Sequence, residues 1–152
     1  MQAKQRGYKL VVVSNQAGIA RRLMTVAEVN AFNQIMADRL AQAGVLLDAI
    51  YFCPHHPDPT KGFPPYVGPC ECRKPAPGML LQAAREHDID LAKSWMIGDR
   101  QSDLQAGWNA GCRSILVKTG YGSEAGSIIN EWSKQPDYVA EDLTEALTWI
   151  LH

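Results

Sequence analysis

Four side chains that commonly bind metal ions stand in one proline-rich stretch, YFCPHHPDPTKGFPPYVGPCECRKPAPG, which spans residues 51–78. Cys53 and His55 form a Cys-x-His pair, and Cys70 and Cys72 form a Cys-x-Cys pair after fourteen intervening residues. Four such ligands complete a tetrahedral zinc site and leave no position open for catalysis. Eight of the nine prolines lie between positions 54 and 77, so this loop has little regular hydrogen bonding and needs another anchor.

The pattern therefore predicts a structural zinc site. His56 is an alternative to His55, since the spacing separates the two only weakly. The other interpretation is a group of ordinary thiols with an incidental histidine. Cys112 stands apart, directly after a glycine, and is expected to be a packed core residue.

Carboxylates and cations suited to phosphate chemistry occur in two further places. Asp99 and Asp103 follow the apolar WMIG segment and lie one helical turn apart. Such hard oxygen ligands suit Mg²⁺, although one of them could instead cap the following helix. The Arg73 guanidinium could bind an anion through two hydrogen bonds, beside the compact positive charge of Lys74. The alternative interpretation is that the two residues are an ordinary solvated basic pair.

A polar turn follows the first apolar run of the chain. Ser14, Asn15 and Gln16 supply a hydroxyl and two amides, and Gly18 lets backbone N–H groups turn toward an anion. This turn is a candidate for binding a phosphoryl group.

These residues must be held by elements that alternate along the chain. Thr25 and Glu28 form a capping box that predicts a helix ending at Gly44, with apolar residues at helical spacing: Val29, Phe32, Met36, Leu40 and Ala43. Residues 2–6 are expected to form the last turn or two of a helix, which ends at Gly7. Strands are expected over residues 10–13, 45–52, 94–99, 114–120 and 138–142, with helices over 77–87, 102–111 and 143–151, the last capped by Asp142.

Alternating strands and helices indicate an α/β fold with a mainly parallel sheet. In such sheets, ligands bind beyond the carboxyl ends of the strands, where Ser14, Asp99 and Lys118 are expected.

The composition fits one globular domain over residues 1–152. The chain is 46% hydrophobic and 20% charged, with a net charge of −1. This balance argues against charge-driven binding of nucleic acid or a membrane surface. No apolar run has transmembrane length, and MQAKQRGYKL lacks the apolar centre of a signal peptide, so a cytoplasmic location is expected.

Together, the motifs VVVSNQAGIAR, YFCPHHP, CECRKPAPGML and MIGDRQSDLQAG resemble the haloacid-dehalogenase-like phosphatases, a Rossmann-like fold. The likeness is strongest to members that remove the 7-phosphate from D-glycero-D-manno-heptose 1,7-bisphosphate in lipopolysaccharide precursor synthesis. The related histidinol-phosphate phosphatases are an alternative, but their zinc loop is typically shorter. A non-catalytic, zinc-stabilised module that binds a phosphorylated ligand is a second alternative.

The resemblance implies a role for each matching residue. Ser14 and Lys74 would hold and stabilise the transferred phosphoryl group. Asn15, Gln16 and Arg73 would contact the substrate. Catalytic Mg²⁺ would be bound by Asp99 and the backbone carbonyl of Arg100, supported by Asp103, and structural Zn²⁺ by Cys53, His55, Cys70 and Cys72. A monomer acting on a small sugar bisphosphate is expected.

One family motif is missing from these residues. The family begins with a strand ending in Asp-x-Asp-Gly, whose first aspartate forms an aspartyl-phosphate, whereas no aspartate precedes Asp38 here. An N-terminally incomplete chain that lacks the first strand is therefore expected. The 152 residues alone are expected to be inactive.

Overall fold

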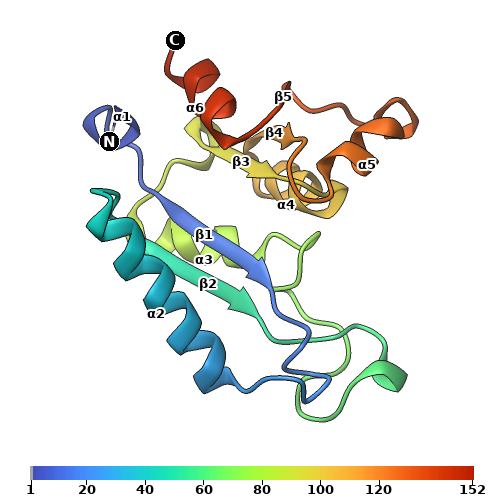
Figure 1. The fold of residues 1–152 in the computed structure, drawn as a ribbon. Helices are drawn as coiled ribbons and strands as arrows, with labels where there is room; N and C mark the ends of the chain where they lie inside the picture. Colours follow the sequence, from blue (N-terminus) through green and yellow to red (C-terminus); the bar gives the residue numbers. More distant parts are fainter. Residues whose placement is uncertain (1) are drawn as a thin grey trace. The chain divides into compact units, whose positions relative to one another are not determined.

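The computed structural model describes residues 2–152. The chain divides into two compact units, Met1–Arg73 and Lys74–His152. Each unit contains parallel strands and the helices that connect them (Figure 1).

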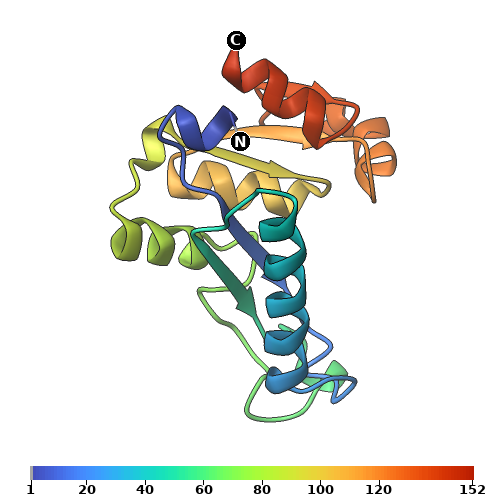
Figure 2. The same cartoon turned by 60° about the vertical axis from the view of Figure 1, so that its left-hand side comes forward.

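The first unit is built around two adjacent parallel strands. After helix α1 (Gln2–Gln5), strand β1 (Val11–Asn15) pairs with β2 (Ala49–Cys53), in a register that sets Asn15 opposite Cys53. Helix α2 (Val26–Gln42) connects them and runs alongside the pair (Figures 1 and 2). A long loop with one short 3₁₀ turn (Pro59–Lys61) follows β2.

The ends of α2 match the sequence pattern, but its buried face differs from the expected one. Thr25 and Glu28 form the predicted capping box, and the helix is followed by Gly44 at a φ of 80°. Val29 is buried as expected, whereas Phe32 is 64% exposed and Asn33 is only 9% exposed. At 100° per residue, Phe32 lies about 60° to one side of Val29 and Asn33 about 40° to the other, so the buried stripe is shifted toward Asn33.

The second unit contains a parallel sheet in the order β3-β4-β5. Its strands are β3 (Trp95–Gly98), β4 (Arg113–Val117) and β5 (Tyr138–Ala140). Its helices are α3 (Gly78–His87), α4 (Gln101–Ala110), α5 (Gly122–Ser127) and α6 (Leu143–Leu151), with short 3₁₀ turns at Leu91–Lys93 and Ile129–Glu131.

Strand β4 is buried on both faces. Ile115 and Val117 pack with Ala146 of α6, while Leu116 packs with Leu104 of α4. Figure 2 shows α4 and α6 on opposite sides of this sheet. This double burial explains the continuous apolar sequence ILV at residues 115–117.

The predicted α/β class is confirmed, and each predicted strand and helix is present with boundaries shifted by a few residues. Asp142 caps α6 by accepting a hydrogen bond from the Glu145 backbone N–H at 2.9 Å. Helix α5 was not expected, because its sequence GSEAGS is poor in helix-forming residues. Among residues 2–152, every helix is too short or too polar to cross a bilayer.

Candidate functional site

The structure gathers Cys53, His55, Cys70 and Cys72 into one cluster at the end of β2 and in the loop that follows. Their ligand atoms all lie within 4.8 Å of one another. The Cys72 Sγ atom lies 3.1 Å from Cys53 Sγ, 3.5 Å from Cys70 Sγ and 3.4 Å from His55 Nδ1. A tetrahedral site with metal–sulfur bonds of about 2.3 Å has edges of about 3.8 Å, so the cluster has the dimensions of a four-ligand metal site.

The choice between the two adjacent histidines follows from their contacts. His55 turns Nδ1 into the cluster, 3.6 Å from Cys53 Sγ. His56 is buried, and its Nδ1 accepts a hydrogen bond from the Asp58 backbone N–H at 3.1 Å. His56 therefore stabilises the loop, and His55 is the histidine of the cluster.

Burial changes the acidity of the cluster's thiols. It raises the pKa of the Cys53 thiol far above its usual range, and the neighbouring Cys72 thiol raises it further. Burial likewise raises the pKa of Cys72. Because thiolates are the metal ligands, an ion that binds here must displace protons and supply the charge that makes buried thiolates stable.

Cys112 behaves as expected for a core residue. It is buried within the second unit and is not one of the cluster's four ligands, and burial raises the pKa of its thiol to about 11. It is therefore a protonated, unreactive thiol at neutral pH.

The Cys/His cluster is joined to the polar segment at the end of β1, where Ser14 and Asn15 are the last residues of the strand and do not form the predicted turn. The Gln16 backbone N–H donates to the Cys53 carbonyl at 2.7 Å, extending the β1–β2 pairing beyond Asn15. Gln16 Nε2 in turn donates to Ser14 Oγ at 3.3 Å. A metal that fixes Cys53 would therefore also fix the backbone of residues 14–16, at the end of β1.

Arg73 closes the same loop from its other end. Its Nη1 donates to the His55 carbonyl at 3.0 Å. One guanidinium donor is thus used within the loop, and the planar group is held at a defined place beside the cluster.

In the second unit, Lys74 and Asp103 form an almost fully buried ion pair. Lys74 Nζ lies 2.8 Å from Asp103 Oδ1, and the two side chains are only 10% and 8% exposed. The other oxygen, Asp103 Oδ2, accepts the Arg100 backbone N–H at 3.0 Å, at the start of α4. Asp103 therefore caps the helix, as one of the two interpretations of its position expects, and also holds Lys74.

Gly98 permits this arrangement. A Cβ at this position would lie 2.3 Å from the Asp103 Cβ. The backbone before Asp99 can therefore pass close to Asp103 only because position 98 carries no side chain.

Asp99 is oriented by a loop that the sequence did not single out. Its Oδ2 accepts the Tyr121 backbone N–H at 3.0 Å. The Arg100 guanidinium lies over the Tyr121 ring, 3.7 Å from its centroid, and fixes the same loop. One carboxylate oxygen is thus held by the protein, which fixes the orientation of the carboxylate.

The predicted site residues fall into one set in each unit. The first unit holds the Cys/His cluster with Ser14, Asn15, Gln16 and Arg73. The second holds Lys74 with Asp99, Arg100 and Asp103. Gly120 and Tyr121 were missed, although a glycine directly after the SILVKT segment was a signal for a close turn.

Comparison with known proteins first identifies the class of protein to which the chain belongs. A family model described as HAD-hydrolase-like matches residues 71–146. A crystal structure of the D,D-heptose 1,7-bisphosphate phosphatase from Bordetella bronchiseptica, complexed with magnesium and phosphate, is similar with a TM-score of 0.83 and 38% sequence identity. That likeness covers 99% of this chain and 78% of the crystal structure's chain.

Sequence relatives define the narrower family. The D-glycero-D-manno-heptose-1,7-bisphosphate 7-phosphatase of Thermosynechococcus vestitus is 42% identical over 95% of this chain and 74% of its own length. The corresponding enzyme of Yersinia pestis is 48% identical over 77% of this chain and 62% of its own length. The chain belongs to the HAD-like hydrolases and, within them, to the family of these heptose-bisphosphate phosphatases.

Proposed function

We propose that this chain carries the site of a Mg²⁺-dependent phosphatase that removes the 7-phosphate from D-glycero-D-manno-heptose 1,7-bisphosphate. The observation that carries the proposal is the 42% identity, over 95% of the chain, to a relative of that name. The buried Lys74–Asp103 pair beside Asp99 supplies chemistry that fits phosphate transfer. The chain spans 62–74% of the relatives' lengths, so the activity is proposed for the whole protein.

The second unit would neutralise the charge of the transferred phosphoryl group. Asp99 and the Arg100 carbonyl fit Mg²⁺, which takes one or two carboxylates and completes its octahedron with waters and phosphate oxygens. When bound, Mg²⁺ supplies positive charge to the phosphate oxygens. Lys74 adds a second positive charge, and Asp103 holds the ammonium group in one place.

The first unit would bind the phosphate and the sugar. Ser14 Oγ can donate a hydrogen bond to a phosphoryl oxygen, while Asn15, Gln16 and Arg73 would contact the substrate. The Cys/His cluster fits Zn²⁺ in a closed, non-catalytic site, because all four positions are filled by protein ligands. The proposed task of the zinc is to fix the loop that carries Arg73.

A substrate comparison tests this function. The protein from its whole reading frame is assayed with Mg²⁺ on heptose 1,7-bisphosphate and on histidinol phosphate. We expect kcat/KM to favour the heptose by at least about a hundredfold, because a site built to hydrogen-bond one substrate leaves polar groups unpaired with another. A preference for histidinol phosphate would assign the related activity, and binding without hydrolysis would assign a non-catalytic module.

Substituting Gly120 is expected to impair Mg²⁺ binding without unfolding the protein. An added Cβ would lie 2.3 Å from Asp99 Oδ2, so Gly120→Ala must displace the carboxylate. Displacing a group that orients a ligand typically costs about 10- to 100-fold in metal affinity. A Mg²⁺ titration followed by thermal shift measures the change.

Gly111→Ala is the matched control. Gly111 also has a left-handed φ, 88° against 62° at Gly120, but an added Cβ would meet nothing within 4 Å. Both variants bear similar backbone strain, and only Gly120→Ala should weaken Mg²⁺ binding. Equal Mg²⁺ affinities in the two variants would contradict the role given to Asp99.

A further inference from the structure

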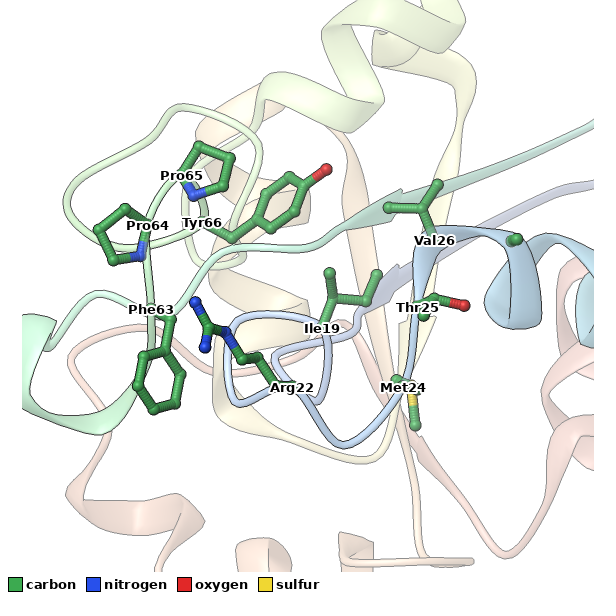
Figure 3. A pocket seen from close by; sticks show the side chains of 10 residues that line it. Ile19, Arg22, Met24, Thr25, Val26, Phe63, Pro64, Pro65 and Tyr66 are labelled. Atoms are coloured by element: carbon green, nitrogen blue, oxygen red, sulfur yellow. The ribbon is translucent and has the colours of Figure 1, made fainter.

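An arginine side chain lies over an aromatic ring in each unit of the chain. In the first unit, the Arg22 guanidinium extends toward Phe63 in the lining of a cavity and lies 4.1 Å from the ring centroid (Figure 3). In the second unit, the Arg100 guanidinium lies 3.7 Å from the centroid of the Tyr121 ring. The second pair includes a residue of the proposed Mg²⁺ site, and the function of its ring is not yet explained.

Tyr121 contacts two neighbouring residues through different parts of its structure. Its backbone N–H donates to Asp99 Oδ2 at 3.0 Å, and its ring lies under the Arg100 guanidinium. Asp99, through its carboxylate, and Arg100, through its backbone carbonyl, are the two proposed protein ligands of Mg²⁺. One residue that supplies no ligand therefore contacts both residues that do.

The backbone of the loop that carries Tyr121 is held close to the end of β4. The Gly122 N–H donates to the Thr119 carbonyl at 3.0 Å, and Ser123 Oγ donates to the Lys118 carbonyl at 3.0 Å. The Tyr121 side chain, by contrast, is 57% exposed. The loop thus presents an outward-facing ring on a fixed backbone, and the Arg100 guanidinium packs on that ring.

The ring contact also controls where a positive charge lies. Arg100 is exposed and directly follows Asp99. A free guanidinium at this position would pair with the neighbouring carboxylate and compete with a metal ion for it. The negative face of an aromatic ring attracts a guanidinium, so the contact with Tyr121 holds this charge at the ring.

Resting on the proposed function, we propose that Tyr121 is a positioning residue for Mg²⁺. Its N–H fixes the rotation of the Asp99 carboxylate, so that Oδ1 is the oxygen offered to the ion. Its ring holds the Arg100 side chain, which keeps the guanidinium from occupying the carboxylate. Groups that orient metal ligands in this way typically change metal affinity by about 10- to 100-fold when they are removed.

Three variants of protein from the whole reading frame test this role. Tyr121→Ala removes the ring and keeps the backbone N–H, whereas Tyr121→Phe keeps the ring and removes only the hydroxyl. Arg100→Met removes the guanidinium and keeps the backbone carbonyl. Mg²⁺ affinity is measured without substrate, by a Mg²⁺ titration followed by thermal shift, and again as the Mg²⁺ concentration that gives half-maximal phosphate release.

Arg113→Met is the matched control. The Arg113 guanidinium also lies 3.7 Å from a ring centroid, that of Trp95. These two residues are the first of β4 and β3 and lie opposite each other in the register, so their pair lies at the amino ends of the strands. Asp99 follows the carboxyl end of β3. Arg113→Met therefore breaks an equivalent contact away from the proposed Mg²⁺ site.

We expect Tyr121→Ala and Arg100→Met each to weaken Mg²⁺ binding by about 10-fold, the lower end of that range because the Tyr121 N–H remains. Excess Mg²⁺ should restore kcat in both variants, with KM for the sugar bisphosphate within about twofold of wild type. Tyr121→Phe and Arg113→Met should match wild type in Mg²⁺ affinity.

Unchanged Mg²⁺ affinity in Tyr121→Ala overturns the inference and leaves the proposed function standing. A raised KM that persists at saturating Mg²⁺ also overturns it, because the ring would then contact the substrate. A loss of kcat that excess Mg²⁺ does not restore would likewise overturn it. Wild-type protein that neither binds Mg²⁺ nor releases phosphate would overturn the proposed function, and the inference with it.

Discussion

In protein from the whole reading frame, an Asp99→Asn variant is expected to lose Mg²⁺-dependent phosphate release by on the order of a thousandfold in kcat. Asparagine keeps the shape of the side chain and can still accept the Tyr121 backbone N–H through its amide oxygen. It loses the negative charge that attracts Mg²⁺. Metal stabilisation of developing charge is worth several kcal/mol, and each 1.4 kcal/mol is about tenfold in rate.

The control for this loss is Asp88→Asn. Asp88 is exposed and ends α3 at a φ of 52°, a conformation that asparagine tolerates. If Asp88→Asn is fully active while Asp99→Asn is folded but inactive, the loss of activity is due to the Asp99 carboxylate. Near wild-type turnover in Asp99→Asn would remove Asp99 from the proposed metal site.

The second large effect is expected for Cys72→Ser, in the unfolding free energy. Cys72 Sγ lies within 3.5 Å of three other ligand atoms, so its loss opens the tetrahedral site. Loss of a structural metal is among the costliest results of a single substitution, about 3 to 5 kcal/mol. In a chain of this size, that corresponds to a fall in Tm of about 10 °C.

Metal content and thermal melting are measured together on protein purified without added metal. Wild type should carry one zinc per chain, and Cys72→Ser should carry much less. Cys112→Ala removes a buried thiol outside the cluster and should retain the zinc, with a loss of about 1 kcal/mol. A Cys72→Ser protein with a full equivalent of zinc and an unchanged Tm would contradict the structural site.

Features that depend on local sequence could be predicted well. The α2 capping box involves residues three apart, and its hydrogen bonds form as expected, with Thr25 N–H donating to Glu28 Oε2 at 2.7 Å. The gathering of Cys53, His55, Cys70 and Cys72 could be predicted because few other arrangements explain so many soft ligands in one loop. The stripe of α2 that is buried could not be fixed, because Phe32 and Asn33 lie on opposite edges of the same face.

Features that depend on contacts between distant residues could not be predicted. The Tyr121 N–H reaches Asp99 across 22 positions, and Arg22 meets Phe63 only because the long loop returns to the turn after β1. Periodicity and propensity carry no information about such contacts. The choice between His55 and His56 likewise depended on where β2 ends. The strand ends at Cys53, so the irregular backbone after it decides which of the two histidines faces the cluster.

The central claim is the removal of the 7-phosphate, and phosphorus NMR of the reaction tests it most directly. Protein from the whole reading frame is mixed with Mg²⁺ and heptose 1,7-bisphosphate, and both phosphate signals are followed over time. The account predicts that the 7-phosphate signal is replaced by that of inorganic phosphate while the 1-phosphate signal persists. Loss of the 1-phosphate instead, or no release by folded protein that binds Mg²⁺, would contradict it.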